Sequence, residues 1–417
     1  MYENNNEKEE LNQIEEEIQD FIENEVEESP LLFNPKDIEI EVKQQSLDVL
    51  ISRIREGAID MNTPFQRNGN LWNEPLQIRL IESILMGMPL PAFYFDASNK
   101  NKWLIVDGLQ RLHTLKNFVL NTESNFLDKE KILDPKAAPL VLKNLHFLRE
   151  YNGLTYDKLN VNDKRTFKET SVTVYLIKPG TPEQVKYELF SRINTGGLML
   201  NAQEIRHALN EGESSTFILN EATENELFRR VVNISRKRMQ DKELALRYFA
   251  FRLSHYSSYN SSFAYFLNNT MTIMNDTPIE KLQELVSDLI KTLTLCEQIF
   301  GKNAFSQSII STKEKPRITF NRALFECLTV NIALLSDVNQ KILLSKKEAF
   351  VKAIKKILDD ETLEQDSFLN QDEILMNQAR GVSFKKSISV STSHTAAVIR
   401  RFRTIELILE NIVKEKS

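Results

Sequence analysis

Asp107, Gly108, Gln110 and Arg111 lie close together in the stretch WLIVDGLQRLHTL. An apolar run typical of a buried strand ends at the Asp107-Gly108 turn, and helical spacing begins directly after it. A strand that ends in a tight turn and opens a helix is typical of an anion site, because backbone N–H groups converge there. In such a site Arg111 would contact a phosphate, Gln110 would donate a neutral hydrogen bond, and Asp107 would bind Mg²⁺ or orient a water molecule.

A purely structural interpretation of the same residues stays open. In it, Asp107 only shapes the turn and Arg111 pairs with a surface carboxylate. An arginine in the first turn of a helix is locally unfavourable by roughly a few tenths of a kcal/mol, since the helix macrodipole is positive at that end. An anion close to the helix start would remove this conflict.

Two further polar clusters precede and follow this stretch. Gln66 and Arg67 lie in a loop and repeat the Gln-Arg pair, although such a loop arginine usually faces solvent. The third cluster is FSRINTGG, in which a Gly-Gly pair between two helices permits positive φ and a close approach of the backbone to a ligand. It can equally be a turn between helices. Its candidate nucleotide-binding residues are Arg192, Asn194, Thr195, Gly196 and Gly197.

Several other kinds of site are excluded or disfavoured by the residues present. The five histidines are scattered, with no His-x-Glu, HExxH or His-Asn-His arrangement, and neither GxxxxGK[ST] nor GxSxG occurs. His113 and His207 each follow a candidate arginine closely, and a structural role is the simpler interpretation of both. Cys296 and Cys327 lie in apolar helical contexts without metal-ligand spacing, which predicts buried thiols.

Charge is distributed unevenly along the 417 residues. Residues 1–30 hold twelve acidic residues against one lysine, a local charge of −11, so that the rest of the chain carries +5 of the total −6. Such a segment is typical of a solvated tail, although its apolar residues recur at helical spacing and would also suit a helix that masks a basic groove. No run suits a membrane span and the start does not resemble a signal peptide, so we expect a soluble cytoplasmic protein.

Basic residues also gather near the C-terminus, interleaved with serines that would suit contacts to DNA phosphates. A solvated helix face is the alternative interpretation. The candidate DNA-binding residues are Lys385, Lys386, Arg400, Arg401 and Arg403.

The surrounding elements predict an α+β protein. An alternating segment followed by a helix with one apolar face (Leu47 to Ile54), the short run AFYF, the run WLIV and the run SVTVYLI indicate a small mixed sheet with helices packed on it. Asn201 and Glu204 have the spacing of a capping box. From about residue 215 the pattern is helical almost throughout. We therefore expect a tail over 1–35, a mixed-sheet domain over 36–214 and an all-helical domain over 215–417.

Taken together, the ordered motifs FQRN, LIESILMGMPLP, FYF, VDGLQRLHTL and LFSRINTGGLMLNAQEIRHAL resemble the N-terminal domain family of the GmrSD-type type IV restriction endonucleases, a branch of the ParB/sulfiredoxin-like fold. The similarity spans about residues 40–215. It implies bacterial anti-phage defence against foreign or modified DNA, with a nucleotide-binding and nucleotide-hydrolysing pocket at a DGQQR motif. That motif maps onto Asp107 to Arg111. Leu109 replaces the family's first Gln, which is harmless only if this position faces the core.

The resemblance implies a nucleoside triphosphate with Mg²⁺ as the ligand, DNA as a further partner, and control of the helical domain or of a partner nuclease. Full GmrSD-type enzymes add a His-Asn-His-like nuclease, and residues 216–417 hold no such histidine arrangement. The alternative from another class is a non-enzymatic DNA-binding sensor. A third is weak nicking of DNA by the ParB-like domain itself. The sequence leaves the oligomeric state open.

Overall fold

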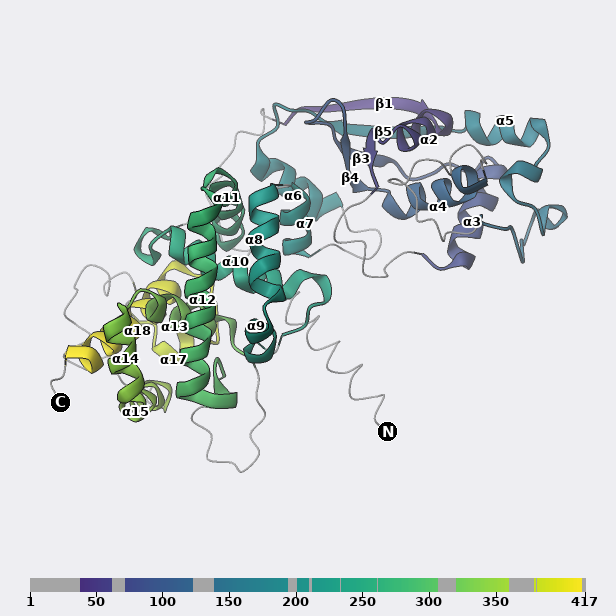
Figure 1. The fold of residues 1–417 in the computed structure, drawn as a ribbon. Coiled ribbons are helices and arrows are strands. Elements are labelled where there is room, and N and C mark those ends of the chain that lie inside the picture. The colour runs from purple at the N-terminus through teal and green to yellow at the C-terminus, as the bar shows by residue number, and fades with distance from the viewer. Residues whose placement is uncertain are drawn as a thin grey trace. The chain divides into compact units, whose positions relative to one another are not determined.

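The computed structural model describes residues 38–61, 72–122, 139–193, 201–209, 212–232, 234–260, 262–306, 320–359, 379 and 381–414. They form two compact units, which divide between Leu209 and Asn210 (Figure 1). The first unit contains a sheet with helices and the second is helical. The predicted acidic tail, residues 1–35, lies outside the described residues.

A five-stranded mixed sheet forms the centre of the first unit, as the sequence pattern predicted. Its strands are β1 (Ile40–Ser46), β2 (Ile59–Asp60), β3 (Phe93–Asp96), β4 (Trp103–Asp107) and β5 (Ser171–Ile177). Their order across the sheet is β1-β5-β3-β4-β2. β1 is antiparallel to β5 and β3 is antiparallel to β4, whereas β3 is parallel to β5 and β2 is parallel to β4.

One face of this sheet carries the core of the unit, because alternate strand residues point to opposite faces. Phe93, Phe95 and Val174 are buried on it. Four helices pack against these residues, and the first of them buries the predicted stripe between Leu47 and Ile54. The helices are α2 (Leu47–Arg55), α3 (Glu74–Leu85), α4 (Leu109–Val119) and α5 (Val161–Glu169).

Two further helices, α6 (Glu183–Ile193) and α7 (Ala202–Leu209), complete the first unit, and α6 contacts β4. The start of α7 has the predicted capping box. The N–H of Glu204 donates to Asn201 Oδ1 at 2.9 Å, and the N–H of Asn201 donates to Glu204 Oε2 at 2.8 Å. Two otherwise unpaired backbone donors at the helix start are thereby satisfied.

The second unit consists of helices around one apolar core, as predicted for the chain after about residue 215. Cys296 and Cys327 are buried in that core as free thiols, which confirms the prediction for both. Within the described ranges, no helix is long and apolar enough to cross a membrane. The helices are α8 (Glu213–Glu224), α9 (Glu226–Val231), α10 (Gln240–Leu253), α11 (Phe263–Asp276), α12 (Ile279–Phe300), α13 (Arg322–Ala333), α14 (Asp337–Ser345), α15 (Lys347–Asp359), α17 (Phe384–Ser387) and α18 (Thr395–Lys414).

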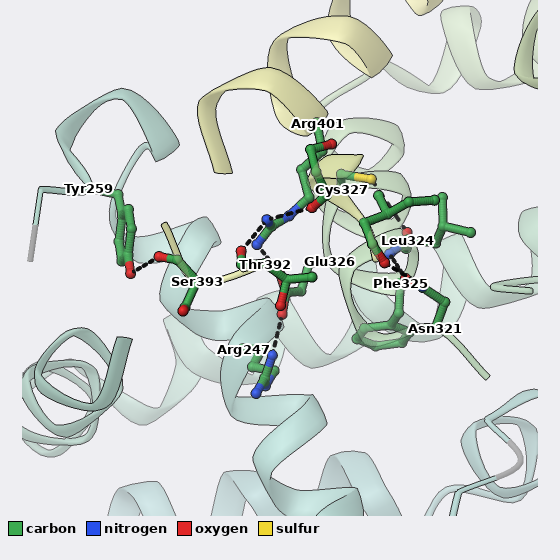
Figure 2. A network of polar contacts seen from close by, with 12 residues as sticks. Arg247, Tyr259, Asn321, Leu324, Phe325, Glu326, Cys327, Thr392, Ser393 and Arg401 are labelled. Carbon is green, nitrogen blue, oxygen red and sulfur yellow. Dashed lines mark hydrogen bonds and ion pairs between the residues drawn. The ribbon is translucent and has the colours of Figure 1, made fainter. Parts of the chain in front are cut away.

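A buried carboxylate joins three helices of this second unit (Figure 2). Glu326 of α13 has a side chain only 1% exposed, and its two oxygens lie 2.7 Å from Arg247 Nη1 of α10 and 2.7 Å from Arg401 Nη2 of α18. Arg247 also pairs with Glu243 on its own helix. Burial by itself would lower the pKa of Arg247, but the two glutamates raise it above its ordinary value. The charges therefore balance inside the core.

We expect Glu326→Gln to lower the stability of the helical unit by roughly 3–5 kcal/mol, because it leaves buried guanidinium charge uncompensated. The measurement is urea unfolding of the full chain followed by far-UV circular dichroism. Both tryptophans, Trp72 and Trp103, belong to the sheet unit, so their fluorescence reports that unit separately. Glu297→Gln, which removes the exposed partner of Arg230, is the control and should barely move the transition. Equal shifts in the two variants would contradict the prediction.

Candidate functional site

The turn between β4 and α4 depends on Gly108. Its φ of +103° is in the left-handed region, and a Cβ at this position would lie 2.5 Å from Cδ1 of Phe93. Gly108 is also the N-cap of α4, and among the described residues no side chain caps that helix start. The first backbone N–H groups of a helix have no intrahelical acceptor and carry the positive end of the macrodipole. A helix start of this kind is suited to an anion.

Arg111 points into the protein from the first turn of α4, with 8% of the residue exposed. Its Nη2 donates to Asp107 Oδ2 at 2.7 Å and to the carbonyl of Ala92 at 3.1 Å, and its Nη1 donates to the carbonyl of Pro91. The guanidinium carbon lies 4.5 Å from the centroid of the Phe93 ring. Burial lowers the pKa of Arg111, and Asp107 partly offsets this effect. The conflict between this arginine and the helix dipole is therefore relieved by partners within the unit.

Asp107 is the more accessible member of this pair, with 32% of its side chain exposed. Its Oδ2 accepts from Arg111, as described above. Directly opposite it in the β3–β4 ladder lies Tyr94, whose pKa is raised by burial, by Tyr175 and by Asp107. Asp107 thus combines a structural contact with a carboxylate that still meets solvent.

Gln110 holds a neighbouring segment in place. Its Oε1 accepts from the N–H of Trp72 at 2.8 Å, and Gln77 Nε2 donates to the carbonyl of the same tryptophan at 2.7 Å. These bonds hold the chain directly after residues 62–71. Trp72 is thereby fixed beside the first turn of α4.

Some candidate residues cannot be placed. Gln66 and Arg67 lie within 62–71, and Asn194, Thr195, Gly196 and Gly197 follow the end of α6; all six are outside the described residues. Arg192, in the last turn of α6, has a side chain 76% exposed, and its Nε lies 3.3 Å from Glu188 Oε2. The described residues bring together Asp107, Gly108, Gln110 and Arg111 but do not link Arg192 to them.

Leu109 is partly buried and packs against the apolar core of the first unit. A glutamine at this position would direct its amide toward the same apolar side chains. The departure from the DGQQR pattern therefore falls at a position that packs against the core.

A buried ion pair at the other end of the sheet escaped the sequence analysis. Lys186 Nζ of α6 lies 3.5 Å from Asp96 Oδ2 at the end of β3, and both side chains are 5% exposed. Asp96 also accepts from the N–H of Ser98 at 2.8 Å. The pair fixes the first half of α6 at this edge. No sequence signal distinguishes this lysine from a solvated one, because its partner is distant along the chain.

The candidate DNA-binding arginines near the C-terminus lie in the interior of the helical unit. Arg400 is 7% exposed and its Nε donates to the carbonyl of Val382 at 2.6 Å, and Arg401 pairs with Glu326. Arg403 has a side chain 13% exposed and pairs with Glu406 of the same helix. These placements do not suit contacts to DNA phosphates, because the guanidinium groups are largely buried and already have partners. Lys385 is half-buried and Lys386 is exposed.

A metal site built wholly from protein side chains is not found. In the part of the chain that the structure describes, no three His, Cys, Asp or Glu side chains are grouped closely enough to bind an ion. His113 is partly buried in α4, and its Nδ1 has no hydrogen-bond partner among the described residues. Burial, followed by repulsion from Lys116, lowers the pKa of His113 to about 4.

Comparison with known proteins gives one family match. Residues 47–210 match the family model described as the N-terminal domain of the GmrSD restriction endonuclease. Neither the curated proteins nor the solved structures contain a match. The matched range covers β2 to β5 and α2 to α7, and so includes the whole β4–α4 turn.

We expect Gly108→Ala to destabilise the sheet unit by roughly 2 kcal/mol or more, because it combines a strained φ with a contact to the Phe93 ring. Urea unfolding followed by tryptophan fluorescence measures the loss. Gly153→Ala is the matched control: φ is +85° there, but no atom lies within 4 Å of the added Cβ. It should cost about 1 kcal/mol. If both variants lose the same stability, the Phe93 contact is unimportant.

His113 should make the sheet unit less stable as the pH falls. Because the pKa is near 4 in the folded chain and near 6.5 in the unfolded chain, the unfolded chain takes up its proton first. The contribution of neutral His113 to stability, roughly 3 kcal/mol, is fully present above pH 6.5 and is lost as the pH falls toward 4. Urea-unfolding midpoints, followed by tryptophan fluorescence at values between about pH 4.5 and 7.5, measure how steeply the stability of the sheet unit changes with pH. His113→Gln should flatten it, and the exposed His146→Gln should not.

Proposed function

Residues 47–210 form a domain of the GmrSD restriction endonuclease N-terminal family, and from this premise we propose that the chain is a restriction-type defence protein that binds a nucleoside triphosphate at the start of α4. Nucleotide binding or hydrolysis would control the helical unit or a partner nuclease. Foreign or modified DNA would be the eventual target.

The observation that carries the proposal is the uncapped start of α4 at Gly108. A phosphate oxygen accepts hydrogen bonds from converging N–H groups at such a site, and the helix dipole favours its charge. Gln110 adds the second feature, since it holds Trp72 beside this helix start.

Arg111 and Gln110 act in this proposal as positioning residues. The Arg111 guanidinium already donates to Asp107 and to two carbonyls, and Gln110 Oε1 already accepts from Trp72. They set the shape of the turn, and the phosphate contacts come from the α4 backbone and from Arg67. Asp107 keeps an exposed carboxylate beside these donors, where it orients an attacking water.

The site would suit a Mg²⁺ ion that binds together with the nucleoside triphosphate. Mg²⁺ in phosphate-binding proteins takes one or two carboxylates and completes its coordination with phosphate oxygens and water. Asp107 is one partly exposed carboxylate of that kind. When bound, the ion would neutralise phosphate charge.

DNA cleavage is assigned in this proposal to a partner protein. Residues 216–417 lack the histidine arrangement of a His-Asn-His nuclease. The alternative of a DNA-binding sensor loses its main support, because Arg400 and Arg401 are buried and paired. The proposal therefore keeps control of the helical unit or of a partner nuclease as the role of this chain.

We expect the full chain with Mg²⁺ to bind and hydrolyse at least one common nucleoside triphosphate. Asp107→Asn should reduce hydrolysis by about 100-fold or more, since it removes the carboxylate that orients the water, while binding changes far less. Release of phosphate and calorimetric titration measure the two effects. The control is Asp48→Asn, which alters an exposed aspartate on α2 paired with Lys168.

Two results would refute the proposed function. One is that none of the common nucleoside triphosphates binds. The other is hydrolysis that persists unchanged in both Asp107→Ala and Arg111→Ala, provided that both variants keep their tryptophan fluorescence transition.

A further inference from the structure

Four residues of the sheet lie in one straight row that begins at the candidate site. Asp107 of β4 is opposite Tyr94 of β3, Tyr94 is beside Tyr175 of β5, and Tyr175 is opposite Val42 of β1. Residues paired in this way share one face of the sheet. Neighbouring strands are about 4.8 Å apart, so the row extends roughly 14 Å from the α4 turn to the edge strand.

The face that carries this row is the one opposite the main core. Phe93 and Val174, the neighbours of Tyr94 and Tyr175 along their strands, are buried on the core face. Tyr94 and Tyr175 themselves are half-buried. Val42 is 56% exposed, on a strand whose other residues are polar apart from Ile40. The row is therefore open to solvent at the β1 end.

The two tyrosine rings leave one aromatic surface unused. They stack at 4.6 Å between centroids with an interplanar angle of 7°, so one face of the Tyr175 ring is covered by Tyr94. Its other face is directed toward β1, where the side chain opposite is the short Val42. A valine is smaller than a phenol ring, and Val42 is exposed. A planar apolar group lying over Val42 would therefore be next to Tyr175.

The next rung along these two strands is polar. Gln44 Nε2 donates to Thr173 Oγ1 at 2.9 Å, and Gln44 Oε1 accepts from Ser171 Oγ at 3.3 Å. Both bonds hold an exposed amide beside the Tyr175–Val42 position. The position thus has an aromatic wall, an apolar floor and a polar edge, which together match a nucleobase better than a sugar or a phosphate.

We propose that this row is the floor of the nucleotide site, with the phosphates at the α4 turn and the base stacked on Tyr175 above Val42. The inference rests on the proposed function, because the Asp107 end of the row is the proposed phosphate site. The length of the row is comparable with that of an extended nucleoside triphosphate. Tyr175 and Val42 are thereby the residues that bind the base, and Gln44 faces its hydrogen-bonding edge.

The test compares a nucleotide with its phosphate chain alone. The full chain is titrated calorimetrically with each of the four common Mg²⁺ nucleoside triphosphates and with Mg²⁺ tripolyphosphate. Tyr175→Ala should weaken binding of the preferred nucleotide by about tenfold, as expected for loss of one base–aromatic stack, and leave tripolyphosphate binding unchanged. Tyr175→Phe, which keeps the ring, should bind the nucleotide as the natural chain does.

A second pair of variants avoids the stacked rings. Val42→Gln replaces an exposed side chain with a longer neutral one that would occupy the base position. It should weaken binding of the nucleotide and leave binding of tripolyphosphate unchanged. Ile40→Gln is the matched control on the same strand and the same face, one rung away, and should have no effect. Unfolding followed by tryptophan fluorescence verifies that each variant is folded.

The outcomes separate this inference from the proposed function. If no nucleotide binds the natural chain, both are refuted. If a nucleotide binds but Tyr175→Ala and Val42→Gln keep full affinity, only the base position is refuted, and the tyrosine stack is a cross-strand pair that stabilises the sheet. If Tyr175→Ala loses the same affinity for the nucleotide and for tripolyphosphate, the base position is also refuted, because the effect would then come from the phosphate end.

Discussion

The geometry of the sheet unit depends on the hydrogen bonds that the buried guanidinium group of Arg111 donates. From the first turn of α4 it reaches the carbonyls of Pro91 and Ala92 before β3 and the carboxylate of Asp107 at the end of β4. A buried charge is tolerated only when its donors are satisfied, so these three segments must keep their relative positions. Gly108 follows from the same constraint, because only a residue without Cβ fits between this arginine and the Phe93 ring.

This constraint changes how anion recognition is distributed over the site. An arginine that is neutralised from within the unit leaves the positive end of the α4 dipole available to a ligand. In the proposed site, an anion would contact backbone donors at the start of α4. Gln110 would contribute indirectly, by holding Trp72 beside this helix start. In the same proposal, the row from Tyr94 to Val42, which begins beside the turn, would bind the rest of the ligand.

The helical unit also contains buried guanidinium groups that are neutralised by partners within the unit. Glu326 is shared by two arginines from different helices, and Arg401 is 1% exposed. The run that contains Arg400, Arg401 and Arg403 therefore serves the packing of α18 against its neighbours. In a sequence, such a run has the composition of a phosphate-binding surface. The charge pattern does not distinguish the two cases, because it does not reveal which side of a helix is covered.

Features that arise from neighbouring residues were determined by the sequence alone. The strand that ends at Asp107, the capping box of Asn201 and Glu204 and the apolar stripe of α2 depend on contacts within a few residues, and all three were predicted correctly. The family was recognisable for a similar reason, since ordered local motifs carry it.

The partners of the buried charges were decided only by the tertiary structure. Arg401 and Glu326 are 75 residues apart, Arg111 and Pro91 are 20 apart, and the row from Asp107 to Val42 joins four strands whose order is not their order in the chain. Whether a charged side chain faces water or the interior is set by which distant segment packs over it. That choice follows from the burial of the whole apolar surface, which no local pattern contains.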